Sequence, residues 1–359
     1  MDLLNEAPGP SSGAPPRPGD QPAAIDRPGP AHTAAVARTL FGRLVRLLSL
    51  LLAVTLAAFV LVSASPVDPV RAYVGAEARS LSPEQLQQIE DRWGLDEPLS
   101  GRFTAWASNV AQGDLGVSQI YDQPVAQVIT ERLPATLSLM LIAWVLSGLL
   151  GFGLGLLAGV YRGGWVDRIF SWWAYTLASA PTFWVGLVLL YVFSVSLQWT
   201  PVCCAAPIGT LLGDATLLER LHHLALPAIT LSLIGVAPTL LHTRQATIEV
   251  MESDHVRFAR SQGERLPGLV LHRVVRNAAG PAIMVQFAGV GELFGGSVLA
   301  EQVFTYPGLG QATTQAALRQ DIPLLLGITL VTAVIVFFGN ALGDLLHRWS
   351  DPRIRTVSS

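Results

Sequence analysis

The amino-acid sequence predicts an all-α integral membrane protein with six transmembrane helices. Of its 359 residues, 51% are hydrophobic and only 14% are charged, whereas about a quarter of the residues in soluble domains are charged. Uncharged apolar runs recur along the chain, and about 20 such residues form a helix that spans the hydrocarbon core. Helices are expected because lipid offers the backbone no hydrogen-bonding partners, so each segment must satisfy its own polar groups.

The composition also excludes several chemistries. All 23 residues counted as Lys+Arg are arginines, so the chain lacks the lysine with which a P-loop contacts nucleotide phosphates and the lysine of Schiff-base enzymes. The sequence contains neither a Ser/His/Asp order nor a recognised metal-binding motif. We therefore expect a protein that is not an enzyme, with no catalytic residue, no metal, no cofactor and no nucleic-acid partner.

Residues 1–36 are rich in proline, glycine and alanine and are predicted to form a disordered cytoplasmic tail, with partner docking as an alternative role. The first transmembrane helix is predicted over residues 37–67, because Arg43 and Arg46 precede an uncharged run from Leu47 to Val67. A cleaved signal peptide is the rival interpretation. Its apolar region is only about 7–15 residues long and lies near the N-terminus, which fits this run poorly.

Residues 68–134 are soluble-like and are predicted to form a small external domain between the first and second spans. Within it, "LSPEQLQQIEDRWGL" predicts a capped helix with Ser82 as the N-cap and Pro83 at the first helical position. The apolar side chains that share one face of this helix are Leu86, Ile89 and Trp93.

Residues 135–350 are predicted to form the transmembrane core. The further apolar runs are Ala135–Tyr161, Ile169–Leu197, Leu224–Leu241, Ala278–Leu299 and Ile322–Gly343. The first of these is rich in glycine, which favours close packing against a neighbouring helix. The second contains Pro181 and is long for one crossing, so we expect a single tilted or kinked helix. Gln286 and Glu292 interrupt the fourth run, which we still count as a span.

The arginines predict the orientation of the chain. They precede the first span, flank the short loop after the second, occur throughout residues 245–277 and follow the last span, whereas the opposite short loops contain only Arg220 and Arg319. By the positive-inside rule, both termini and the 245–277 segment are cytoplasmic. Residues 351–359 then form a cytoplasmic C-terminal tail, and six crossings agree with this parity.

The cytoplasmic segment contains "HVRFARSQGERLPGLVLHRVVRNAAGP", which carries five arginines among helically spaced apolar residues. Gly263 and Pro267 are expected to break it into two short helices at an angle. From the residues alone, three interpretations stay open. The segment lies on the membrane surface, docks into a groove of a partner, or is a solvated loop whose arginines contact lipid headgroups.

Several motifs in this chain occur in a characteristic order. "ARSQG" is followed by Arg276-Asn277 and Pro281, then by "GGSVLAEQVFTYPGLGQ", "DIP" and "DPRIR", and "GDLGVS" and "RLPATLSL" precede them. This order resembles inner-membrane permeases of ATP-binding-cassette importers, specifically the dipeptide/oligopeptide/nickel group, over about Arg43 to Arg355. The general importer motif begins Glu-Ala-Ala, and Arg257, Phe258 and Ala259 stand at those places here.

The resemblance implies the type I importer permease fold and a role as the transmembrane permease of an ATP-driven importer for dipeptides, oligopeptides or a related solute. A nickel or metal-chelate importer of the same family is an alternative. The implied partners are a second homologous permease, two ATP-binding-cassette ATPases, an extracytoplasmic solute-binding protein and the lipid bilayer of a bacterial cytoplasmic membrane. The residues expected to couple the permease to the ATPases are Arg257, Phe258, Ala259, Arg260, Gly263, Arg276 and Asn277.

Gln286, Glu292 and Glu301 are candidates for the substrate path. An intramembrane carboxylate costs about 2.5–3.5 kcal/mol on insertion scales, so Glu292 is expected to face the bundle interior or a water-filled path. It either meets a cationic group of the cargo or is satisfied by a partner helix or by protonation. Glu301 either serves an outer gate or caps and joins helices.

The outer loop raises a separate question, because Cys203–Cys204 and His222–His223 lie in it. Adjacent side chains diverge and chelate poorly, so burial or a vicinal disulfide competes with a metal site. Two other functional classes also remain open. An ion-gradient-driven secondary transporter would need paired broken helices in internal repeats, and a structural or sensory membrane protein would act through its external domain.

Overall fold

The computed structural model describes residues 30–64, 70, 82–93, 98–207, 209–210 and 214–350. The predicted tails at 1–29 and 351–359 lie outside the described residues. The tail was predicted over residues 1–36, and its last part is helical in the structure. α1 (Pro30–Ser63) begins within it. The chain divides into two units, residues 1–48 and 49–359. α1 crosses this boundary, and the other elements discussed below belong to the second unit.

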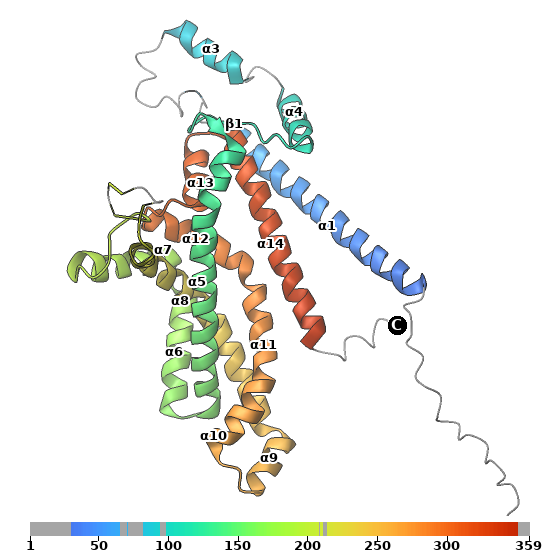
Figure 1. Ribbon diagram of the computed structural model, residues 1–359, viewed down its shortest axis with the longest axis vertical. Helices are drawn as coiled ribbons and strands as arrows, with labels where there is room; N and C mark the ends of the chain where they lie inside the picture. The colour runs from blue at the N-terminus through green and yellow to red at the C-terminus, as the bar shows by residue number, and fades with distance from the viewer. Residues whose placement is uncertain are drawn as a thin grey trace, which may run out of the picture. The chain divides into compact units, whose positions relative to one another are not determined.

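Four long helices match predicted spans. They are α1, α5 (Val125–Val160), α8 (Leu217–Glu252) and α14 (Ile322–Ser350), and each contains a stretch long and apolar enough to cross a membrane. Two bent helix pairs supply the remaining candidates, so that the described residues contain six spans if each pair counts as one. The predicted all-α membrane class is thereby confirmed (Figure 1).

The third span differs from its predicted form. It was expected to be one tilted or kinked helix, but α6 (Trp165–Ser179) ends before Pro181 and the next helical segment leaves at 109°. That segment is α7 (Thr182–Leu189) continued by the π-helix η2 (Leu190–Ser196). Ala180 adopts an extended backbone with ψ 131°, because the proline that follows disfavours the helical region for it. The single span was expected with a tilt or a kink, and the structure has a sharp break at Pro181 in its place.

The fifth span is bent as well. It is formed by the helical segment Leu266–Ala288, whose last part is α11 (Val275–Ala288), and by α12 (Val290–Val303), which meet at 52° around Gly289. Gln286 precedes this bend and Glu292 follows it. The two polar residues that interrupt the apolar run thus flank the break in the helix.

The remaining elements are α3 (Pro83–Trp93), α4 (Leu99–Ala111), α13 (Leu309–Leu318) and a hairpin of β1 (Val117–Ser118) and β2 (Gln123–Pro124). The predicted cap of α3 is present. The Gln85 backbone N–H donates to Ser82 Oγ at 3.3 Å, and the Ser82 N–H donates to Gln85 Oε1 at 2.9 Å. These reciprocal bonds satisfy two donors at the start of the helix.

α5 and α8 form the closest helix pair. A Cβ on Gly155 of α5 would lie 2.5 Å from the Leu240 carbonyl oxygen and 2.7 Å from Thr243 Cβ of α8, so only glycine permits this approach. Gly151 and Gly159, one turn to either side of Gly155, make the same kind of contact with α8. The glycine-rich run therefore does what its composition predicts, which is to bring two helix backbones together.

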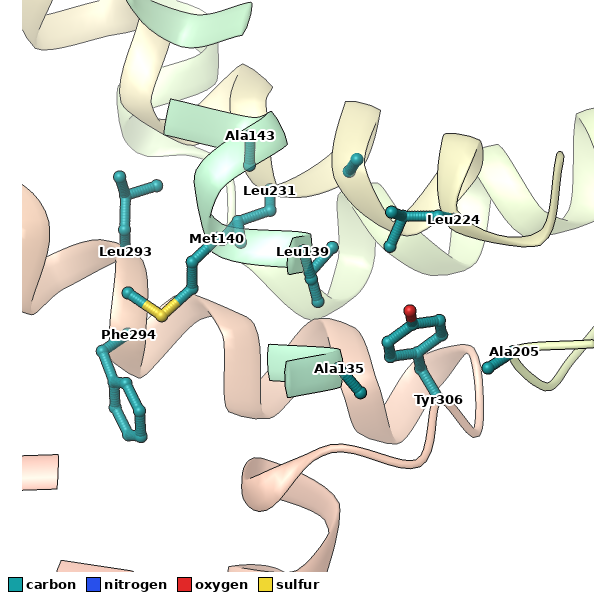
Figure 2. Packing of buried hydrophobic residues seen from close by; sticks show 11 residues of the cluster. Ala135, Leu139, Met140, Ala143, Ala205, Leu224, Leu231, Leu293, Phe294 and Tyr306 are labelled. Carbon is teal, nitrogen blue, oxygen red and sulfur yellow. The ribbon is translucent and has the colours of Figure 1, made fainter. Parts of the chain in front are cut away.

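α12 packs with the α5–α8 pair and completes the core of the bundle. Leu139 of α5, Leu231 of α8 and Leu293 of α12 are buried in one cluster, in which Tyr306 lies at the end beside Ala205 (Figure 2). The core thus connects the α5–α8 pair with the bent fifth span. It places Gln286 and Glu292 beside α8 rather than at the far edge of the bundle.

Candidate functional site

A short helical elbow follows α8 at the end of the bundle away from α13 and the β1–β2 hairpin (Figure 1). We define it as residues 253–274, comprising α9 (Asp254–Ser261), the turn after it, α10 (Leu266–Leu269) and the π-helical turn η3 (Val270–Val274). The turn after α9 is closed by two backbone bonds, from Gly263 N–H to Arg260 O and from Glu264 N–H to Ala259 O. Gly263 has φ +82°, the left-handed conformation that favours glycine at a helix C-terminus.

Gly263 and Pro267 were expected to break the segment between two helices. The break lies between Ser261 and Leu266, and Pro267 stands in the first turn of α10, where its missing N–H is not needed. This second arm of the elbow then continues through η3 into α11 without a break. Arg273 Nε donates to Glu264 Oε2 at 2.9 Å, which fastens the turn to the second arm. The expected break between two helices is present, with Gly263 in the turn, but only α9 is short, since the second helix runs on from Leu266 to Ala288.

The elbow has one buried side and one exposed side. Its buried side chains are Val256, Ala259, Leu269 and Val274, which pack against Leu156 of α5 and against Val250 and Met251 of α8. Arg257, Phe258 and Arg260 lie on the exposed side, and the Phe258 side chain is 67% exposed. Ala259, a predicted coupling residue, therefore anchors the elbow to the bundle, while its neighbours in the motif face outward.

Arg276 and Asn277, the other two predicted coupling residues, are exposed on the continuous helix that leaves the elbow. Asn277 Nδ2 donates to the Arg273 carbonyl at 2.7 Å, one turn earlier in the same helix. Because the helix runs through both positions, neither residue caps a helix start.

Gln286 connects three membrane helices. Its amide nitrogen donates to the Trp144 carbonyl at 2.6 Å and to Ser147 Oγ at 2.8 Å, and its amide oxygen accepts from Thr239 Oγ1 at 2.8 Å. The side chain is buried, and it lines both a cavity of about 20 Å³ beside α8 and an apolar cavity of about 300 Å³ beside α5. Its hydrogen-bonding capacity is thus largely used within the chain.

Glu292 is exposed, in contrast to Gln286. It lies on the rim of the smaller cavity with Ile234 and Pro238 of α8. In the described ranges its carboxylate makes neither a hydrogen bond nor an ion pair. A carboxylate inside a membrane-spanning segment is costly unless water or another polar group meets it.

Glu301 is fully buried near the C-terminal end of α12 and lines neither cavity. Its carboxylate accepts from Thr136 Oγ1 at 2.7 Å and from the Gln311 backbone N–H at 3.0 Å. Thr136 also accepts from the Leu309 N–H at 2.8 Å. These bonds satisfy the orphan donors at the start of α13, where negative charge is favoured, so the geometry is that of the capping alternative.

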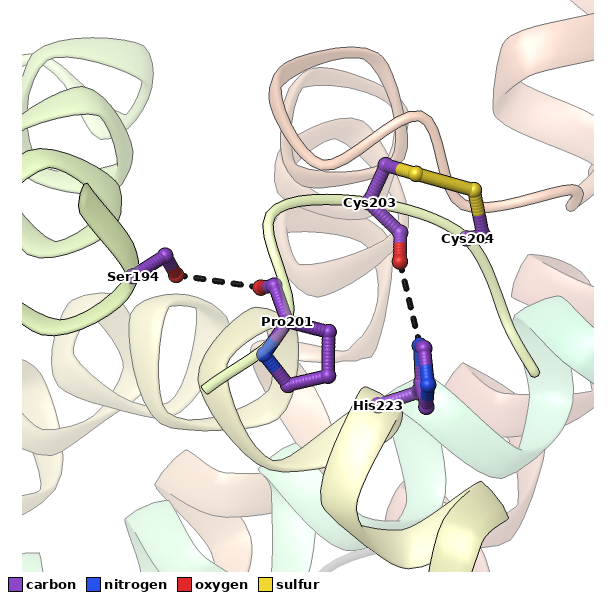
Figure 3. Close-up of a disulfide and its surroundings, with 5 residues drawn as sticks. All are labelled: Ser194, Pro201, Cys203, Cys204 and His223. Carbon is purple, nitrogen blue, oxygen red and sulfur yellow. Dashed lines mark hydrogen bonds between the residues drawn. A yellow bond between two sulfur atoms is a disulfide. The ribbon is translucent and has the colours of Figure 1, made fainter. Parts of the chain in front are cut away.

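Cys203 and Cys204, in the loop before α8, form a disulfide (Figure 3). The His223 ring donates through Nδ1 to the Cys203 carbonyl at 3.0 Å, and the Cys204 N–H donates to the Phe304 carbonyl at 3.2 Å. Among the described residues, no group of three or more His, Cys, Asp and Glu side chains could hold a metal ion. The vicinal disulfide is therefore the arrangement in the structure, and the two hydrogen bonds hold the loop against α8 and the end of α12.

One pair was missed by sequence reasoning. Asp167, in the first turn of α6, is paired with Arg244 of α8 and also accepts a hydrogen bond from the Gly163 N–H at 2.8 Å. The signal was present, because each is a charged residue at the edge of a long apolar run. Pairing them required knowledge that α6 and α8 are neighbours.

Two family models together match most of the chain. The family described as "Binding-protein-dependent transport system inner membrane component" matches residues 151–356, and its N-terminal counterpart, "Binding-prot-dependent transport system membrane comp, N-term", matches residues 36–140. The chain is 32% identical over 306 residues to the "Oligopeptide transport system permease protein AppB" of Bacillus subtilis (strain 168), covering 85% of this chain and 95% of that protein.

A second relative is the "Di/tripeptide transport system permease protein DppB" of Pseudomonas aeruginosa (strain UCBPP-PA14), which is 36% identical over 317 residues and covers 84% of this chain and 94% of that protein. Among solved structures, the inward facing MetNI methionine ABC transporter in its CY5 native crystal form is similar with a TM-score of 0.51 at 16% identity. That match covers 63% of this chain and 97% of the other chain, and at this identity it shows a shared fold.

Proposed function

Because the chain belongs to the family of binding-protein-dependent transport system inner membrane components, we propose that it is the permease subunit through which an ATP-driven importer moves peptides across the cytoplasmic membrane. The names of the oligopeptide and di/tripeptide permeases that it resembles support peptides as the cargo. The chain itself carries no nucleotide-binding lysine, so separate subunits bind and hydrolyse the ATP.

The observation that carries this proposal is the construction of the elbow. Phe258 projects from α9 between Arg257 and Arg260, while Ala259 holds the same helix against the bundle. An exposed aromatic side chain among arginines is the composition of a protein-binding hot spot. The elbow is thus suited to receive force from an ATPase, and Gly263 and the Arg273–Glu264 ion pair keep its two arms at a fixed angle.

A force applied at the elbow would be transmitted directly to helices that cross the membrane. The buried side of the elbow contacts the ends of α5 and α8, and these helices are packed so closely that glycine is required between them. A displacement of the elbow therefore moves α5 and α8 together. Rigid-body motion of this kind drives alternating access when the remaining helices do not follow.

The proposed assembly contains this chain, a second homologous permease, two ATPases and an extracytoplasmic solute-binding protein. Both termini and the elbow lie in the cytoplasm, which accords with the arginines in residues 245–277 and with the positive-inside rule. Arg276 and Asn277 lie exposed on the helix that leaves the elbow, where they contact the ATPase or the headgroup layer. Gln286 and Glu292 border the solute path at the bend of the fifth span.

Replacement of Phe258 by alanine tests the proposal. The variant should remain in the membrane but bind the ATPases about 30-fold more weakly, since a hot-spot side chain contributes about 2 kcal/mol. Co-purification with the ATPases and ATP-driven peptide uptake into vesicles are measured. Phe338→Ala is the control, because Phe338 is 60% exposed on α14 and away from the elbow. Normal uptake by Phe258→Ala, or ion-gradient-driven uptake by the purified chain alone, would refute the proposal.

A further inference from the structure

The exposed side of α12 differs in chemistry from the exposed sides of the neighbouring membrane helices. It presents Glu292, Gly295 and Leu299 at helical spacing. Nothing lies within 4 Å of the position that a Cβ on Gly295 would occupy. The other helices expose large aliphatic side chains, among them Leu52, Leu56, Leu141 and Leu149. Leu299 is of this kind too, but Glu292 and Gly295 place a carboxylate and an open backbone on the same face.

A carboxylate inside a membrane-spanning segment requires water or a counter-charge. The described part of this chain supplies no counter-charge to Glu292, although other carboxylates near the membrane helices, such as Asp167 and Glu301, are each satisfied by two or more partners. Glu292 also borders a cavity of about 20 Å³, which is enough for one water molecule. The arrangement leaves the charge available to a group that arrives from outside the chain.

We propose that Glu292 receives a primary ammonium group of the transported solute as the solute passes the bend between α11 and α12. This inference rests on the proposed function, in which the solute is a peptide. A peptide carries such a group at its amino terminus and, where lysine is present, on a side chain. Both present the same chemistry to a carboxylate, namely a compact charge with several N–H donors.

The position of Glu292 suits a transient contact. Gln286 is tied to α5 and α8 on one side of the bend, whereas Glu292 stands on the other side, beyond Gly289. A change in the 52° bend would therefore carry the carboxylate toward or away from α8. A charge that is displaced during the cycle can bind the ammonium group in one state and release it in the next.

Uptake by the complete transporter, reconstituted with its ATPases, second permease and solute-binding protein, tests the inference. Three peptides are compared in wild type and Glu292→Gln: Ala-Ala-Ala, N-acetyl-Ala-Lys-Ala and N-acetyl-Ala-Ala-Ala. We expect at least a tenfold loss of uptake in the variant for a peptide with an ammonium group, and no loss for the peptide without one. The first two peptides distinguish the amino terminus from the lysine side chain. For each peptide, uptake by the variant is divided by uptake by the wild type. This ratio cancels the preference of the solute-binding protein for that peptide, because the same binding protein serves both transporters.

Two further variants control for assembly. Glu292→Asp keeps the charge and should retain most of the uptake. The double variant Glu292→Gln with Gly295→Asp moves the carboxylate one turn along the exposed side of α12 into open space, and it should recover part of the loss. Equal uptake of Ala-Ala-Ala by wild type and Glu292→Gln overturns the inference, as does an equal loss for all three peptides, which would indicate an interface with another subunit. If the wild-type transporter takes up no peptide, the proposed function fails instead.

Discussion

Asp167 and Arg244 join α6 to α8 through two parallel hydrogen bonds, with Nε 2.5 Å from one carboxylate oxygen and Nη2 2.8 Å from the other. The Asp167 side chain is 6% exposed and the Arg244 side chain 27%. Ser171 and the Gly163 N–H complete the shell of the carboxylate. The pair thereby fixes the turn between α5 and α6 to the same helix that leads into the elbow.

Arg244→Ala should destabilise the protein strongly, because it leaves the buried Asp167 carboxylate without its counter-charge. Breaking a buried pair costs about 3–5 kcal/mol, and the partial exposure of Arg244 places the expected cost toward the lower end. Thermal unfolding of the purified protein measures it. Arg162→Ala is the control, since the Arg162–Glu252 pair is exposed and should contribute less than about 1 kcal/mol. Similar losses for the two variants would contradict this distinction.

Gly155→Ala should separate α5 from α8. The added Cβ would lie 2.5 Å from the Leu240 carbonyl oxygen, and overpacking of this kind costs about 1–3 kcal/mol. Gly153→Ala is a matched control on the same helix, because its Cβ would meet nothing within 4 Å. Alanine is the better helix former by about 1 kcal/mol, so the control should be neutral or stabilised. The unfolding temperatures of both variants are measured. A lower unfolding temperature in Gly153→Ala as well would show that the destabilisation does not come from the contact between α5 and α8.

Gly263→Val should leave the protein in the membrane while uncoupling ATP hydrolysis from uptake. The left-handed backbone at Gly263, with φ +82°, costs a residue with a Cβ about 1–2 kcal/mol, and a β-branched side chain is held there least well. The space around it is open, so the change acts through the backbone of the corner and not through a clash. The measurement is the ratio of peptide uptake to ATP hydrolysis in the reconstituted transporter.

The control for this corner is Gly280→Ala, which lies in α11 with nothing within 4 Å of its Cβ and a helical backbone that alanine accepts. It should behave as wild type. Normal coupling in Gly263→Val would count against a docking role for the elbow. It would leave the positive φ as a purely local feature of the turn.

The spans could be predicted from sequence because lipid imposes one simple rule, that backbone groups must be satisfied within each segment. The corner at Gly263 was also visible, since few residues other than glycine take a positive φ. The size of the break at Pro181 could not be predicted from the sequence. Proline removes a donor and restrains its neighbour, but whether the chain kinks or turns through 109° depends on what packs beside it.

Pairings between distant segments were the least predictable features. Asp167 and Arg244 are 77 residues apart and Thr136 and Glu301 are 165 residues apart, so no local pattern connects them. Glu301 illustrates the consequence. As a sequence position it was equally a gate residue or a cap, and only the position of the first turn of α13 next to it distinguishes the two geometries.

Glu301→Gln should therefore destabilise the outer end of the bundle without changing which peptides are carried. Both carboxylate oxygens of Glu301 accept hydrogen bonds, from Thr136 Oγ1 and from the Gln311 N–H, and an amide nitrogen cannot accept, so one of these bonds is lost. Leaving a buried polar group unsatisfied costs about 1–3 kcal/mol. Glu249→Gln is the control, because Glu249 is exposed and bonds only to Gln245 among the described residues.

A double-mutant cycle with Thr136→Val separates the cap from the gate. Thr136 donates to Glu301 and accepts from the Leu309 N–H, so the two substitutions disturb one hydrogen-bonded network and their unfolding free energies should not add. A coupling of at least about 0.5 kcal/mol between the two positions is expected for residues in such contact. If Glu301→Gln instead unfolds at the wild-type temperature but changes the relative uptake of different peptides, Glu301 belongs to the solute path. The hydrogen bonds at the start of α13 would then be incidental to its role.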